Sequence, residues 1–233
     1  MTTRDTEENG SNSWTFQQES FYNALIAGDF SSCLAVADNV DSTSQMISFY
    51  RQVVQPSMYN IGEAWMMGNI SISQEHLASS LSGRVASTLH ARFISPSHTK
   101  GRVIVSGVPS EYHELGAWVI ADALELEGWE VRYLGANVPV SVILNRTMQF
   151  RPHLLALSIT MPANIESARQ VISEIRQLEP IAATTVLVGG NAMNIHQGIW
   201  QNIGADGYAE DIEKAVVFTR QFWERLPESK LLP

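Results

Sequence analysis

The sequence has 233 residues, 45% of them hydrophobic and 17% charged, which is enough for one large domain or two small ones with hydrophobic cores. Its formal net charge of −9, with lysines and arginines scattered singly, argues against direct binding to nucleic acid, whose phosphates attract basic surfaces. The single cysteine, Cys33, excludes an intramolecular disulfide framework and any multi-cysteine zinc or iron-sulfur site built from this chain.

Residues 1–13 are polar and acidic and have no periodic apolar face, so we expect a disordered tail. They lack the apolar segment of a signal peptide, and no apolar run in the chain approaches the roughly 20 residues that a membrane span needs. We therefore expect a soluble, cytoplasmic protein with no membrane partner.

Residues 14–94 carry a helical pattern. Apolar residues recur every four positions near the end of this segment, at Leu77, Leu81, Val85 and Leu89. The residues Ser71 to Gln74 have the form of a capping box and predict that the last helix begins at Ser71. The segment is predicted to be a small helical bundle.

Residues 101–233, after a polar connector with proline and glycine, alternate short apolar runs with amphipathic stretches. The predicted strands are 102–106, 130–134, 153–158, 184–188 and 207–209. The predicted helices are 114–126, 140–150, 165–178, 195–202 and 211–225. Five such units predict a parallel sheet covered on both faces, with ligands at the carboxyl ends of its strands.

His113 lies in the loop after the first predicted strand, where such a fold binds ligands. A neutral imidazole is a common ligand of transition metals, and Glu111 could accept a hydrogen bond from its other nitrogen and fix the tautomer. Taken alone, a loop histidine could equally cap the next helix or lie in solvent.

Five segments, in order along the chain, resemble the motifs of the cobalamin-binding Rossmann-like (flavodoxin-like) domain. They are Glu111-x-His113-x-x-Gly116, the Leu134 to Pro139 turn, Ser158-Ile159-Thr160, Gly189-Gly190 and Gly204 to Ala209. The one departure is Glu111, where the family usually has aspartate, and a longer carboxylate still reaches the imidazole.

The resemblance implies that His113 is the lower axial ligand of cobalt, replacing the dimethylbenzimidazole base, whose displaced tail enters a slot between the sheet and its helices. Gly189 and Gly190 would let the backbone approach that tail closely. The cofactor-binding residues implied in this domain are Glu111, Tyr112, His113, Gly116, Gly135, Val138, Pro139, Ser158, Thr160, Gly189, Gly190 and Tyr208.

The bundle carries Trp65, nine further residues, and then Glu75-His76. This spacing resembles the light-sensing, cobalamin-dependent regulators of the CarH type, in which the bundle covers the upper face of the corrin. The resemblance implies that Trp65 packs over an adenosyl group, Glu75 hydrogen-bonds its ribose, and His76 can bind cobalt after photolysis. The alternative is a core tryptophan and a solvated Glu-His pair.

These resemblances favour an adenosylcobalamin-dependent photoreceptor, a signalling protein rather than an enzyme, that acts on transcription through a sister subunit in a homo-oligomer or a separate output protein. The alternative is a corrinoid carrier of a methyltransferase system, and a radical-mutase subunit is less favoured. The architecture is also similar to photocobilins, which carry a bilin such as biliverdin. Cys33, the single possible thioether site, lies in an apolar helix and is expected to be buried and inert.

Overall fold

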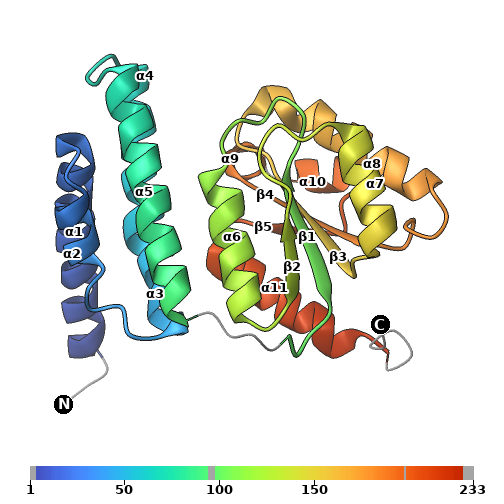
Figure 1. Cartoon of the computed structure of the whole chain (residues 1–233), viewed down its shortest axis with the longest axis horizontal. Coiled ribbons are helices and arrows are strands. Elements are labelled where there is room, and N and C mark those ends of the chain that lie inside the picture. Colours follow the sequence, from blue (N-terminus) through green and yellow to red (C-terminus); the bar gives the residue numbers. More distant parts are fainter. Residues whose placement is uncertain (1–3, 94–97, 197, 228–233) are drawn as a thin grey trace. The chain divides into compact units, whose positions relative to one another are not determined.

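The computed structural model describes residues 4–93, 98–196 and 198–227 (Figure 1). The chain divides into two compact units, residues 1–94 and 95–233, and each is described by itself. None of the helices in the described ranges is long and apolar enough to span a membrane.

The helical unit begins with α1, Arg4–Ala27, and α2, Phe30–Val36. Helix α1 includes residues 4–13, so the prediction of a disordered tail is wrong for them, and residues 1–3 lie outside the described part. The physical reason is cooperativity. The segment contains no proline, and extending an existing helix adds one hydrogen bond for each residue fixed, without a new nucleation step.

Three further segments, α3 (Thr43–Phe49), a π-helical turn (Tyr50–Val54) and α4 (Gln55–Met66), follow one another directly. Helix α5, Ile72–Phe93, completes the unit. The predicted capping box is confirmed, because Gln74 N–H donates to Ser71 Oγ at 3.3 Å and Ser71 N–H donates to Gln74 Oε1 at 2.9 Å. The apolar side chains of α5 at Leu81, Val85 and Leu89 are buried, whereas Leu77 is exposed.

The second unit is built on five parallel strands in the order β2-β1-β3-β4-β5 (Figure 1). Their bounds are β1 Arg102–Gly107, β2 Glu130–Tyr133, β3 Leu154–Ser158, β4 Thr185–Gly189 and β5 Gly207–Ala209. The predicted fold, a helical bundle followed by a flavodoxin-like parallel sheet, is confirmed. Strand order reverses between β1 and β3, and a ligand site is expected at their carboxyl ends.

Helices cover both faces of this sheet (Figure 1). One face packs against α6 (Leu115–Leu126) and α11 (Ile212–Arg225) through a core that includes Val103, Leu124 and Trp129. The other face packs against α7 (Val140–Phe150) and α8 (Ile165–Gln177), which follows a short 3-10 turn at Pro162–Asn164.

The helix predicted at 195–202 is two short helices instead, α9 (Asn191–Ile195) and α10 (Ile199–Asn202). The break falls at Gly198, whose φ of 81° belongs to the left-handed region, so no single helix can pass through it.

Candidate functional site

The loop after β1 is held in a fixed shape by the turn after β2. Ser110 has φ 66° and donates its N–H to Asn137 Oδ1 at 2.8 Å, and Asn137, with φ 49°, donates its own N–H to the carbonyl of Glu111 at 2.6 Å. Non-glycine residues with positive φ are uncommon and need support from their surroundings. Two strained residues that hold each other's loops fix the position of Glu111 and His113.

Glu111 is fully buried at the switch point of the sheet and accepts hydrogen bonds at both carboxylate oxygens. Its Oε1 accepts from His113 N–H at 3.1 Å and contacts His113 Nδ1 at 2.5 Å. Its Oε2 accepts from the N–H groups of Thr160 and Met161, at 2.8 and 3.0 Å, and from Asn164 Nδ2 at 3.0 Å. The carboxylate therefore ties the loop after β1 to the loop after β3.

These contacts determine the charge of Glu111 and the tautomer of His113. Burial alone raises the pKa of Glu111, but the hydrogen bonds from His113, Met161 and Asn164 outweigh it and hold the pKa at about 2. An ionised carboxylate can only accept, so the Nδ1 of His113 carries the proton. The Nε2 of this half-exposed imidazole is then the nitrogen with metal-ligand character, as the carboxylate–histidine pair predicts.

Asn164 is a site residue that the sequence reasoning missed. Its buried side-chain amide donates both to Glu111 Oε2 and, at 3.1 Å, to the carbonyl of Ser110. It follows the Ser158-Ile159-Thr160 segment by a few residues, in the 3-10 turn that starts at Pro162, and no motif marks it. Its position in the turn before α8 was the one available signal.

Replacing Asn164 by leucine, which keeps the approximate volume and removes both donors, is expected to weaken cobalamin binding by roughly 10-fold, because the support of a ligating histidine contributes about that much. Titration of the purified variant with hydroxocobalamin, followed by absorbance, measures the effect. Asn145→Leu, an exposed amide on α7, is the matched control and should leave the affinity unchanged. Equal affinities of the two variants would contradict a supporting role for Asn164.

The other predicted residues of the lower site lie around these two loops. Tyr112 and Gly116 are exposed beside His113, and a side chain at Gly116 would meet open space. Gly135 has φ 97°, and its carbonyl accepts from Gly107 N–H at 2.9 Å.

The turn that follows leads into α7, with Val138 buried and Pro139 exposed at the helix N-cap. Ser158 ends β3, and Thr160 binds Glu111 through its backbone. The structure thus brings the loops after β1, β2 and β3 together.

Gly189 and Gly190 are required by packing within the protein, a different reason from the one expected. A Cβ at Gly189 would lie 2.9 Å from the carbonyl oxygen of Ala209, and one at Gly190 would lie 2.4 Å from that of Ile159. Gly190 also has φ 104°. The ends of β3, β4 and β5 approach too closely for any side chain, so these glycines are explained without a ligand. Tyr208 on β5 donates its hydroxyl to Asn194 Oδ1 at 2.6 Å.

In the helical unit, the predicted residues Trp65, Glu75 and His76 lie on either side of the turn between α4 and α5. Trp65 is 45% exposed, so the alternative of a core tryptophan does not hold. His76 Nδ1 lies 2.6 Å from Glu75 Oε2, and Ser79 Oγ donates to Glu75 Oε1 at 2.8 Å.

Exposed apolar side chains also lie at the end of α4, in the turn and in the first turns of α5. We call the exposed residues Trp65, Met66, Met67, Ile72 and Leu77 the helix-turn patch. Exposed apolar residues in the same part of the chain as a hydrogen-bonded Glu–His pair are typical of a binding surface.

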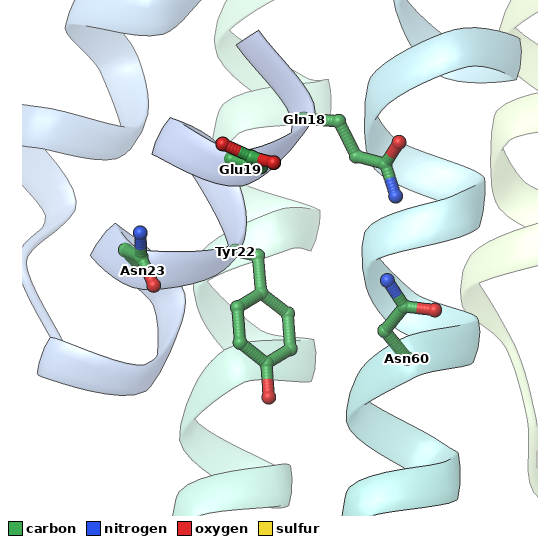
Figure 2. A pocket seen from close by; sticks show the side chains of 5 residues that line it. All are labelled: Gln18, Glu19, Tyr22, Asn23 and Asn60. Atoms are coloured by element: carbon green, nitrogen blue, oxygen red, sulfur yellow. The ribbon is translucent and has the colours of Figure 1, made fainter. Parts of the chain in front are cut away.

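Two other features of this unit are separate from the patch. Cys33 is fully buried, and burial, assisted by Asp29, raises the pKa of its thiol to about 11. The prediction of a buried thiol is confirmed, and its low reactivity stays a prediction that the burial and the raised pKa support. A polar hollow of about 280 Å³ lies between α1 and α4, where Gln18 and Asn60 approach the same space (Figure 2).

Comparisons with known proteins match both units. Models described as B12 binding domains match residues 17–89 and 101–217. The chain is 29% identical over 187 residues to the HTH-type transcriptional repressor CarH of Myxococcus xanthus, covering 80% of this chain and 61% of the repressor. It therefore spans less than two thirds of that relative.

Corrinoid proteins match as well. The chain is 22% identical over 200 residues to dimethylamine corrinoid protein 1 of Methanosarcina mazei, covering 85% of this chain and 92% of that protein. The solved monomethylamine corrinoid protein of Methanosarcina barkeri superposes with a TM-score of 0.74 at 15% identity, covering 88% of this chain and 96% of that one. The structural match shows the fold.

Proposed function

Because the chain belongs to the family of proteins with a B12 binding domain, we propose that it is an adenosylcobalamin-dependent photoreceptor module. The observation that carries the proposal is the helix-turn patch with its oriented Glu75–His76 pair, at the spacing from Trp65 that resembles the CarH-type regulators. The similarity to the CarH repressor supports the same function.

The residues of the second unit fit a corrinoid. A corrin supplies four nitrogen ligands of its own, so the protein needs to provide few ligands to cobalt. His113 offers a half-exposed imidazole whose tautomer is fixed by a buried carboxylate, which is the arrangement of a metal-ligating histidine. Open space at Gly116 and Gly135 leaves the surrounding loop surface accessible to a large planar group.

In this proposal the lower site holds the cofactor and the helix-turn patch determines its use. Trp65 would pack against the adenosyl group, Glu75 would hydrogen-bond its ribose, and His76 would offer a second imidazole to cobalt. When bound, adenosylcobalamin supplies a cobalt–carbon bond that visible light breaks.

The protein's response is a rearrangement of the helical unit. Loss of the adenosyl group would expose the apolar residues of the helix-turn patch that it had covered and would leave Glu75 with its partners within the helix, Ser79 and His76. A shift of α4 and α5 that covers these apolar residues again would alter the surface read by a sister subunit or a separate output protein. The module is then a regulator of transcription through that partner and has no catalytic residue of its own.

A corrinoid carrier of a methyltransferase system is the second candidate. The observation that favours it is the extent of the match, since the chain spans 92% of the dimethylamine corrinoid protein. A carrier needs the lower site and fold but has no use for a light-driven response from the patch. The carrier function predicts that a methyltransferase transfers a methyl group to the bound cofactor. It also predicts that His76→Ala leaves this transfer unchanged.

Illumination of the reconstituted protein tests the proposal. After loading with adenosylcobalamin in the dark, green light is expected to convert the absorption spectrum to one typical of cobalt with two imidazole ligands. His76→Ala should still lose the adenosyl group but fail to reach that spectrum, while His196→Ala, an exposed histidine of the other unit, should behave as the natural chain. An unchanged spectrum after light would reject the photoreceptor function, and methyl transfer would then support the carrier.

A further inference from the structure

A groove of about 530 Å³ lies at the edge of the sheet, between β2 and the C-terminal half of α7. Its apolar floor and walls include Ile104, Leu134 and Phe150, and its polar lining includes Arg132, Arg146 and Gln149. The groove runs along β2 from Val131 to Leu134, where the turn after β2 begins, and Phe150 at the end of α7 forms part of its other wall. Neither the lower site nor the helix-turn patch uses it.

Positive charge is concentrated around Phe150. The guanidinium carbons of Arg132 and Arg102 lie 5.2 and 5.7 Å from the centre of its ring, and Arg146 lies one helical turn before it on α7. Among the described residues, Arg132 pairs with Glu130 at 3.2 Å, whereas Arg146 donates to the neutral Gln149.

The buried Nε of Arg102 has no hydrogen-bond partner among the described residues. Within the described ranges these three guanidinium groups have one carboxylate partner, so in a chain of net charge −9 they form a local site for anionic groups.

The open edge of β2 supplies main-chain partners next to this charge. Glu130 N–H donates to Gly101 and Leu134 N–H donates to Val105, so these residues face β1. Backbone groups alternate in direction along a strand, so those of Val131 and Tyr133 face outward, where none of the strands in the described part of the chain pairs with them. Charged side chains on a short edge strand can simply prevent edge-to-edge aggregation. That role would not require an apolar groove lined by Ile104 and Phe150 beside the strand.

We propose that this groove binds an extended, acidic peptide segment of a partner protein, which adds as a strand to β2. Its backbone pairs with Val131 and Tyr133, its acidic side chains meet Arg132 and Arg146, and its apolar side chains lie over the groove floor. The inference does not rest on the photochemistry, because Val131, Tyr133, Arg132 and Arg146 are not among the predicted cofactor-binding residues.

Fluorescence anisotropy with a labelled peptide that alternates valine and glutamate tests the proposal on the full, cobalamin-loaded chain. The double variant R132E/R146E should bind the peptide roughly 10-fold or more weakly, and it should gain affinity for the matching valine–lysine peptide. K214E/R225E, two exposed reversals on α11, carries the same change in net charge and should bind as the natural chain does.

Two further probes test strand addition itself. A valine–glutamate peptide with alternate backbone nitrogens methylated keeps its charge but cannot pair with β2, and it should lose binding. If the methylated peptide or an oligothymidylate bound as tightly as the parent peptide, the groove would be a general anion site and the proposal would be overturned. Equal loss in R132E/R146E and K214E/R225E would overturn it as well.

Discussion

Replacing Glu111 by leucine is expected to lower the free energy of unfolding by about 3 to 5 kcal/mol and to weaken cobalamin binding by roughly 10- to 100-fold. The carboxylate is fully buried and accepts hydrogen bonds from five donors, which the substitution would leave without their partner. It would also release the constraint on the His113 tautomer. Urea unfolding of the cofactor-free protein and titration with hydroxocobalamin measure the two effects.

Two controls separate this effect from a general disturbance of the loop. Glu114→Leu changes an exposed carboxylate in the same loop and should alter both quantities little. Glu111→Gln keeps the size and one acceptor oxygen but brings an amide against the donors, so it should fall between the natural chain and Glu111→Leu. If Glu111→Gln bound cobalamin as tightly as the natural chain, the charge of Glu111 would have no part in holding His113.

The element order and the pairing of Glu111 with His113 could be predicted from the sequence because both depend on local patterns. Each strand is a short apolar run bounded by polar or glycine-containing segments, and the predicted strands agree with the observed ones to within a residue at each end. Glu111 and His113 are two residues apart, so their pairing needs only the local loop.

The second half of the site depends on the tertiary fold and had no local signal. Asn164 and the N–H groups of Thr160 and Met161 reach Glu111 because β1 and β3 are neighbours in the sheet, about 50 residues apart in sequence. A backbone donor leaves no trace in residue type, and an asparagine in a turn has many other uses.

The two glycines at the end of β4 show the same limit in the opposite way, because their positions were predicted but the reason for them was not. Gly189 and Gly190 were predicted as ligand-facing positions, and their membership of the cofactor site stays a prediction. The contacts that demand glycine there come from Ala209 and Ile159, which belong to other strand ends. Sequence can locate such a glycine, but the group that excludes its side chain is known only when the strands are placed.

At pH values above about 7, Asp122→Asn is expected to be more stable than the natural chain by about 3 to 4 kcal/mol. Burial in α6, and after it the charge of Glu125, raises the pKa of Asp122 to about 7, despite a hydrogen bond from Trp118 that lowers it. The unfolded chain ionises this carboxyl near pH 4, so the folded state must keep a proton that the unfolded state has lost. The contribution of Asp122 to stability is therefore full below about pH 4 and is lost as the pH rises to about 7.

Asparagine is neutral throughout this range and keeps an oxygen to accept from Trp118, so the difference between the two proteins should be near zero at about pH 4 and reach its plateau above about pH 7. Urea unfolding across that range measures it. Glu125→Gln should lower the pKa of Asp122, so its stability should fall less as the pH rises and should reach the plateau at a lower pH than in the natural chain. Glu179→Gln, exposed after α8, should leave the curve unchanged. Parallel curves for Asp122→Asn and the natural chain would show that Asp122 is ionised in the folded protein, and α6, which starts directly after the His113 loop, would then carry a buried charge.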